Sequence, residues 1–183
     1  MTTYIALLRG VNVGGKNKID MRALKAAFTE AGFSGVRTYI NSGNIIFASE
    51  LSEAAVQTSC ENLIAERFGL QIAIAILTAD ELSQALANAP DWWGSAPDSK
   101  HNTIFIIPPA TTEEVLAQIG EIKPEYERLD YCGKLIFWSA PIATFSRTRL
   151  TKIVQSKSAY NAITTRNANT ARKLAELGKP HRT

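Results

Sequence analysis

The chain has few of the cysteine and histidine residues that metal-dependent and covalent chemistry often uses. Its 183 residues include only two cysteines, Cys60 and Cys132, and two histidines, His101 and His181. Two cysteines outside a Cys-x-x-Cys pair are too few for a disulfide framework or a zinc cluster, so we expect buried, unreactive thiols. The sequence also lacks a nucleophile elbow, a Ser-x-x-Lys motif and any His, Cys and carboxylate cluster with metal-ligand spacing. It therefore predicts neither a metal nor a cofactor.

Long apolar runs and a strong charge of one sign are also missing. No run approaches the roughly 18–20 residues of a membrane-spanning helix, and residues 1–9 lack the features of a secretory signal, so we expect a cytoplasmic protein without a membrane partner. The net charge of +3 is below that of a dedicated nucleic-acid binder. It permits an anionic partner without requiring one, and the oligomeric state is left open.

The first part of the chain predicts the element order β-α-β-β-α-β. β-rich runs indicate the strands, and apolar residues at helical spacing indicate the helices. Asp20 and Ser52 are suited to cap the two helices, Gly69 to end the second, and Gly43 to close a hairpin after Ser42. In chain order the predicted elements cover residues 4–9, 21–31, 36–40, 45–48, 53–68 and 72–77.

The second half repeats this order after a connecting helix at 79–88 and a loop. The predicted elements are a strand at 103–107, a helix at 111–119, a hairpin of 125–131 and 135–139 turning at Cys132-Gly133, a basic helix at 147–155, a strand at 163–165 and a helix at 169–177. We expect an α+β protein of two ferredoxin-like subdomains with mainly antiparallel sheets, at 1–78 and 101–183, joined by residues 79–100.

Three segments resemble the signatures of the domain of unknown function 1697 family. They are ALLRGVNVGGKN at 6–17, RTYINSGN at 37–44 and TTRN at 164–167. The resemblance implies a bacterial-type α+β protein with two ferredoxin-like subdomains and no established activity. The chain departs from the family pattern at Ala168, where an aromatic residue is usual, and at 148–151, where TRLT replaces Ser-Lys-Leu-Thr.

The glycine-rich loop after the first strand is the first candidate site. A strand, a glycine-rich turn and a helix let backbone N–H groups approach an anion. Asn17 stands where a nucleotide-hydrolysing P-loop needs a Ser or Thr hydroxyl, which argues against that kind of loop. In the alternative interpretation the glycines only let the chain turn, and the asparagine side chains bond their own backbone. Because two cations flank the turn, we expect an anion site that includes Arg9, Gly10, Asn12, Gly14, Gly15, Lys16 and Asn17.

Three further clusters could contact the same kind of ligand. One is the hairpin turn, one is the basic helix and one precedes the terminal helix. The alternatives are a solvated helix surface for the second cluster and an N-cap, Asn167 or Asn169, for the third. The candidate residues are Tyr39, Ser42, Gly43 and Asn44; Arg147, Arg149 and Lys152; and Thr165, Arg166 and Asn167.

Three functions are consistent with these clusters. The first is binding of a phosphate-bearing ligand, nucleic acid included, although the aromatic strand signature of RNA-recognition modules is missing. The second is an enzyme acting on a small anionic substrate or nucleotide, with Tyr39 or a carboxylate as proton carrier and a pocket where the loop, the Ser42-Gly43 turn and Arg166 converge. The third is a structural role, in which Asn12 and Arg166 are buried and hydrogen-bonded within the protein.

Overall fold

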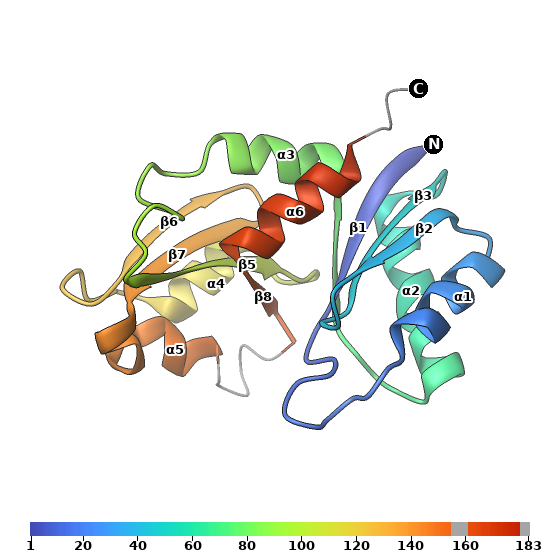
Figure 1. The fold of residues 1–183 in the computed structure, drawn as a ribbon, viewed down its shortest axis with the longest axis horizontal. Coiled ribbons are helices and arrows are strands. Elements are labelled where there is room, and N and C mark those ends of the chain that lie inside the picture. Colours follow the sequence, from blue (N-terminus) through green and yellow to red (C-terminus); the bar gives the residue numbers. More distant parts are fainter. Residues whose placement is uncertain (155–160, 180–183) are drawn as a thin grey trace. The chain divides into compact units, whose positions relative to one another are not determined.

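The computed structural model describes residues 1–154 and 161–179, which form two α+β units (Figure 1). The first unit comprises residues 1–82 and the C-terminal part of helix α6 (Ala168–Gly178) from Leu174 on. The second comprises Ser83–Lys173, so the boundaries fall inside α3 (Ala79–Ala87) and α6. These boundaries differ from the predicted ones, 1–78 and 101–183, because a helix that is shared by two units has no break in its sequence pattern.

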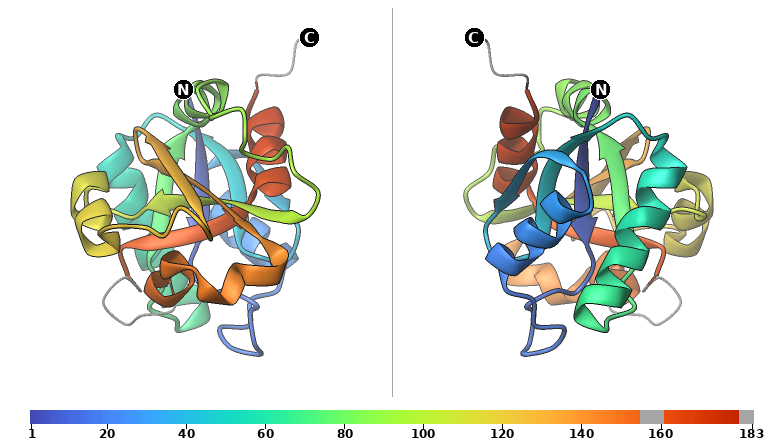
Figure 2. Two further views of the ribbon diagram at one scale, coloured as in Figure 1. Left: turned by 90° about the vertical axis from the view of Figure 1, so that its left-hand side faces the viewer. Right: turned by 90° about the vertical axis from the view of Figure 1, so that its right-hand side faces the viewer.

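In the first unit a four-stranded antiparallel sheet has the strand order β2-β3-β1-β4. Helices α1 and α2 lie side by side on one face of this sheet (Figure 2). The elements are β1 (Thr2–Leu8), α1 (Met21–Glu30), β2 (Ser34–Tyr39), β3 (Asn44–Ser49), α2 (Glu53–Phe68) and β4 (Ile74–Thr78).

The core of the first unit lies between the sheet and these two helices. Alternate residues of β1 face the helices, as the period of two along a strand requires. Phe47 of β3 anchors an aromatic cluster, with its ring centroid 5.5 Å from that of Phe28 and 4.6 Å from that of Phe33. Asp20 caps α1 as predicted, because its Oδ1 accepts hydrogen bonds from the first-turn N–H groups.

The second unit repeats the fold with the strand order β6-β7-β5-β8, again fully antiparallel. Val115 and Ile119 of α4 and Leu150 of α5 pack with Ile104 and Ile136 in its core. The elements after α3 are β5 (Ser99–Ile106), α4 (Thr112–Ile119), β6 (Arg128–Cys132), β7 (Leu135–Pro141), the 3-10 helix η1 (Ile142–Arg147), α5 (Arg149–Val154), β8 (Ile163–Asn167) and α6.

The predicted α+β class and the twofold β-α-β-β-α-β order are confirmed. Several predicted bounds differ from the structure: the strands predicted at 103–107 and 125–131 begin at Ser99 and Arg128. The basic helix begins at Arg149 and not at 147, because the chain forms η1 and then an extended Thr148; its predicted end at Gln155 lies outside the described residues. The β6–β7 turn is formed by Gly133 and Lys134, one residue later than predicted.

The two cysteines differ in environment. Cys60 of α2 is fully buried, and this burial, with a smaller contribution from the Glu61 carboxylate, raises the pKa of its thiol to about 12. Cys132, expected to be buried, is only half-buried because it ends the edge strand β6. Within residues 1–154 and 161–179, none of the helices has the length and apolarity needed to cross a membrane.

Candidate functional site

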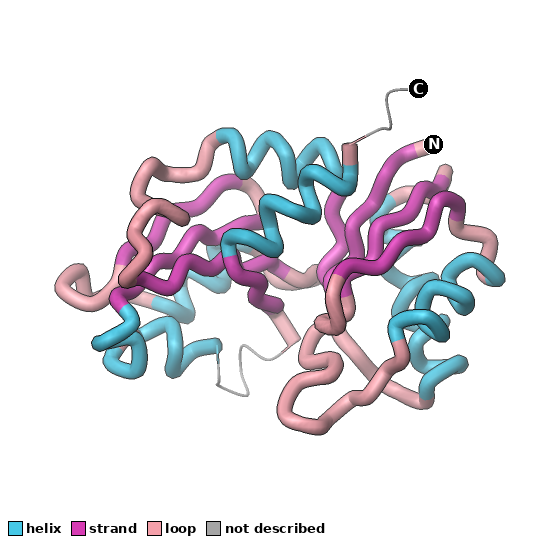
Figure 3. Tube along the Cα trace, in the orientation of Figure 1, coloured by secondary structure: helices cyan, strands magenta, loops and turns pink. Residues whose placement is uncertain are grey.

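The glycine-rich loop and the hairpin turn, predicted as separate parts of a site, meet in the first unit. The Leu8 N–H donates to the Gly43 carbonyl at 2.8 Å, which places the end of β1 against the turn. Figure 3 shows the connection that follows β1 as a long loop leading to α1. The Asn12 Nδ2 donates to the backbone carbonyl of Asn41 at 3.0 Å and ties this loop to the turn.

Most polar groups of these two segments are used within the protein. Asn12 also forms two hydrogen bonds with Ile19, and Asn17 Nδ2 donates to the Gly10 carbonyl at 3.2 Å. Asn44 is fully buried, with Nδ2 donating to the Tyr39 carbonyl and the Ser42 hydroxyl. Gly14, Gly15 and Lys16 are exposed at the tip of the loop, and Arg9 is half-buried at its start.

The basic cluster around α5 is also engaged internally. Arg149, expected to contact phosphate, directs its Nε to the Ile119 carbonyl. The hydroxyls of Thr148 and Thr151 both bond the Phe145 carbonyl, at 2.8 and 3.0 Å. Arg147 and Lys152 are exposed, and the Arg147 guanidinium lies 6.0 Å from the centroid of the Tyr126 ring.

The residues before α6 stabilise β8 and the helix start. Arg166 is buried, and its Nη1 donates to the Thr164 hydroxyl and the Thr165 carbonyl, both at 2.9 Å. Asn167 Oδ1 accepts a hydrogen bond from the Thr170 N–H at 2.8 Å, so the expected N-cap is Asn167. Arg166 belongs to the second unit, whereas the glycine-rich loop and the hairpin turn belong to the first.

A different constellation lies across the second sheet. Ser139 of β7 pairs with His101 of β5 on one side and with Arg128 of β6 on the other. Because residues directly opposite in neighbouring strands point to the same face, the three side chains form a row. This row lines a cavity of about 280 Å³, here called the Ser139 cavity, to which Trp92 and Glu125 also contribute.

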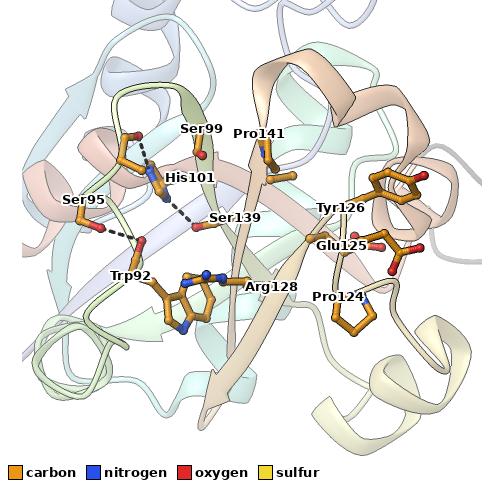
Figure 4. Close-up of a pocket in the computed structure, with 13 residues that line it drawn as sticks. Trp92, Ser95, Ser99, His101, Pro124, Glu125, Tyr126, Arg128, Ser139 and Pro141 are labelled. Carbon is orange, nitrogen blue, oxygen red and sulfur yellow. Dashed lines mark hydrogen bonds between the residues drawn. The ribbon is translucent and has the colours of Figure 1, made fainter.

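The hydrogen bonds of His101 determine which ring nitrogen carries a proton. Nε2 lies 2.8 Å from the Ala96 carbonyl oxygen, which can only accept, so Nε2 carries a hydrogen. In the neutral imidazole Nδ1 is then an acceptor, and the Ser139 hydroxyl, 2.5 Å away, donates to it. Figure 4 shows both interactions, next to the loop that contains Ser95 and Ser99. The result is a serine hydroxyl hydrogen-bonded to an oriented base.

Charges around the Ser139 cavity are unevenly distributed. Among the described residues, none accepts a hydrogen bond or ion pair from the Arg128 guanidinium. Glu127 is 2% exposed, and its carboxylate accepts hydrogen bonds from the Arg149 and Leu150 N–H groups at 2.6 and 3.2 Å. The Glu125 carboxylate points away from the His101–Ser139 pair (Figure 4). Arg128 therefore contributes a cation to the lining of the Ser139 cavity, which also includes Glu125 and Glu127.

The row of His101, Ser139 and Arg128 was missed at the level of sequence. The pairing of Arg128 with Ser139 follows from a two-residue turn at Gly133-Lys134, and placing the turn one residue earlier hid it. His101 is 38 residues from Ser139, so no local spacing connects them. In the part of the chain that the structure describes, no group of three or more His, Cys, Asp or Glu residues is arranged to hold a metal ion.

Comparisons with known proteins agree with this architecture. The solved structure of the conserved bacterial protein SP0830 from Streptococcus pneumoniae is similar over 97% of this chain and 99% of that chain, with 33% sequence identity and a TM-score of 0.86. No functionally curated protein matches the sequence. The family model described as "Protein of unknown function (DUF1697)" matches residues 1–137, which include two of the three signature segments. The chain therefore belongs to the DUF1697 family.

Proposed function

We propose that the protein binds a small anionic ligand, one that bears a carboxylate or phosphate group, in the Ser139 cavity. The observation that carries this proposal is the Arg128 guanidinium, which lines the cavity and forms no ion pair or hydrogen bond with another described side chain. A guanidinium presents a planar fork of donors that matches two oxygens of a carboxylate or phosphate. Arg128 is therefore available for an external anion.

The size and lining of the cavity favour a small ligand over a polymer. Its volume of about 280 Å³ lies just below the roughly 300–1,000 Å³ that ligand pockets span. The half-buried Trp92 offers an apolar wall to the body of the ligand, while Arg128 contacts its charged group. We expect a metabolite-sized molecule rather than a nucleic acid.

Thermal unfolding with a ligand panel tests the proposal. The panel comprises inorganic phosphate, succinate, AMP and a short RNA, each added to the wild type and to the Arg128→Gln variant. A ligand at about 100 times its dissociation constant stabilises the folded state by roughly 2.7 kcal/mol. We expect at least one small anion to raise the midpoint of the wild type but not that of the variant.

Lys16→Gln is the matched control, because it removes one exposed cation from the glycine-rich loop of the other unit. This variant should respond to the ligand like the wild type. Equal stabilisation of wild type and Arg128→Gln would show that the anion binds elsewhere, and a loss of response in Lys16→Gln would assign it to the loop. A response to RNA alone would contradict a small-ligand site.

We further propose a structural role for Asn12 and Arg166, which were first expected to contact the ligand. Both side chains form hydrogen bonds within their own unit, to Ile19 and Asn41 for Asn12 and to Thr164 and Thr165 for Arg166. Removing them should lower stability without changing the ligand response of the variants that remain folded.

A further inference from the structure

We infer that Ser139 is a nucleophile and His101 its general base, so that the Ser139 cavity hydrolyses small esters or thioesters through an acyl-serine. This inference rests on the proposed function, because the oxyanion of a tetrahedral intermediate is itself an anion beside Arg128. It assigns a reaction to the site, whereas the proposed function assigns only binding.

The first support is the geometry of the pair. A general base must lie within hydrogen-bond reach of the proton that it removes. Nδ1 of His101 is 2.5 Å from the Ser139 Oγ, and the proton on Nε2 leaves Nδ1 with the free electron pair. Ser139 is 6% exposed, and its side chain lines the cavity, so the hydroxyl is held in one place next to bound ligand.

The second support is the orientation of the base. In activated serine sites a third group usually holds the imidazole in the required tautomer and stabilises the imidazolium that forms. The Ala96 carbonyl occupies this position, 2.8 Å from Nε2 of His101. Because Nε2 keeps its hydrogen in both the neutral and the charged ring, this hydrogen bond persists throughout proton transfer.

The third support is the cation next to the nucleophile. Arg128 is the direct cross-strand neighbour of Ser139, and Cβ atoms of such pairs are about 4.5–5.5 Å apart. Donors aimed at a developing oxyanion often supply the largest share of catalysis. The guanidinium is available to this oxygen because no other described side chain accepts its hydrogen bonds.

The reaction proceeds in two balanced halves. The Ser139 Oγ bonds to the carbonyl carbon while its proton moves to Nδ1 of His101; the bond to the leaving oxygen or sulfur then breaks, and that atom takes the proton. In the second half water gives a proton to Nδ1 and its oxygen attacks the acyl carbon. The Ser139 Oγ leaves and recovers the proton, so one ester and one water yield one acid and one alcohol or thiol.

The experiment uses p-nitrophenyl acetate as a neutral ester probe with the full-length protein. Nitrophenolate release gives the rate, and peptide mass spectrometry of protein quenched during turnover locates the acetyl group. We expect acetylation of Ser139 in the wild type. Ser139→Ala should lose the adduct and the protein-dependent rate, and His101→Gln should lose roughly 10²–10⁴-fold in rate.

Ser146→Ala is the matched control, because Ser146 is an exposed serine of the same unit that does not line the Ser139 cavity. Its rate should equal that of the wild type. No acetyl group on Ser139 of the wild type, with equal rates for wild type and Ser139→Ala, would overturn the inference. That result is independent of whether His101→Gln folds.

The two proposals fail separately. Ser139→Ala keeps Arg128 and should keep the stabilisation by a small anion that supports the proposed function. If the anion stabilises both proteins but Ser139 is never acetylated, binding stands and the reaction is wrong. If Ser139 is acetylated but no anion stabilises the wild type, the reaction stands and the proposed ligand class is wrong.

Discussion

Asn12 forms two hydrogen bonds with a single residue, Ile19: its Oδ1 accepts from the Ile19 N–H and its Nδ2 donates to the Ile19 carbonyl, each at 2.9 Å. The Asn12 backbone has φ of 55°, in the left-handed region that asparagine tolerates better than most residues. One side chain therefore closes the loop between β1 and α1, and its Nδ2 also reaches Asn41 of the hairpin turn.

Replacing Asn12 should lower the free energy of unfolding rather than ligand affinity. Asn12→Gly keeps the left-handed backbone but loses the hydrogen bonds, so we expect a loss of about 1–3 kcal/mol. Asn12→Ala should lose roughly a further 1 kcal/mol from backbone strain. Urea denaturation measures both, with Lys16→Ala as an exposed control from the same loop that stays within about 0.5 kcal/mol of the wild type. Wild-type stability in Asn12→Gly would contradict the structural role.

The Gly43→Ala substitution should be more harmful than Gly133→Ala. Both glycines have positive φ, 70° and 56°, so each alanine costs about 1 kcal/mol in backbone strain. A Cβ on Gly43 would also lie 2.8 Å from the Leu8 Cβ, whereas a Cβ on Gly133 meets nothing within 4 Å. We expect about 1–3 kcal/mol of additional destabilisation in Gly43→Ala, measured by thermal or urea unfolding. Equal losses would show that the turn can move away from β1.

Glu127→Gln should destabilise the second unit. The Glu127 carboxylate is buried and accepts hydrogen bonds from the N–H groups of Arg149 and Leu150 at the start of α5. An amide replaces one acceptor oxygen with a donor, which leaves a buried N–H without a partner at a cost of about 1–3 kcal/mol. Glu121→Gln, on the exposed surface, serves as the control and should unfold like the wild type. Hydrogen exchange of α5 amides should speed up only in Glu127→Gln.

The raised pKa of the Cys60 thiol predicts a loss of stability at alkaline pH. Its thiol has a pKa of about 12 in the folded protein, against an ordinary value of 9.0 in the unfolded chain. Between these values the unfolded chain releases a proton that the folded protein keeps, so the free energy of unfolding falls as pH rises above 9. Urea titrations at several pH values should show this slope in the wild type and a smaller one in Cys60→Ala. An unchanged slope in that variant would assign the pH dependence to other groups.

A thiol reagent should distinguish the buried Cys60 from the half-buried Cys132. At pH 8 a thiol reagent should modify the half-buried Cys132 in the native protein and spare Cys60, because the thiolate is the reactive form and burial disfavours it. Both should react in urea. Rapid modification of Cys60 in the native protein would contradict its buried, protonated state.

The sequence by itself determined the elements and their order. Asp20 and Ser52 cap α1 and α2 through N–H groups two or three residues away, and Gly69 ends α2 in the left-handed conformation. These interactions are local, so residue type and spacing are enough to predict them. β-rich runs and apolar residues at helical spacing likewise predicted which segments are strands and which are helices, and the repeated element order predicted two ferredoxin-like units.

Only the tertiary structure decided which polar residues are available for function. Arg149 and Arg166 have the residue type of an anion site, but Nε of Arg149 and Nη1 of Arg166 donate hydrogen bonds to carbonyl and hydroxyl oxygens of their own unit. Glu127 and Arg149 are 22 residues apart, and His101 and Ser139 are 38 residues apart. Strand register brings His101 and Ser139 together, and a shift of one residue would turn one of the two side chains to the other face of the sheet. Glu127, just before β6, meets Arg149 because α5 starts beside it. Residue type is a local property, whereas the partner that satisfies or activates a side chain depends on contacts between distant segments.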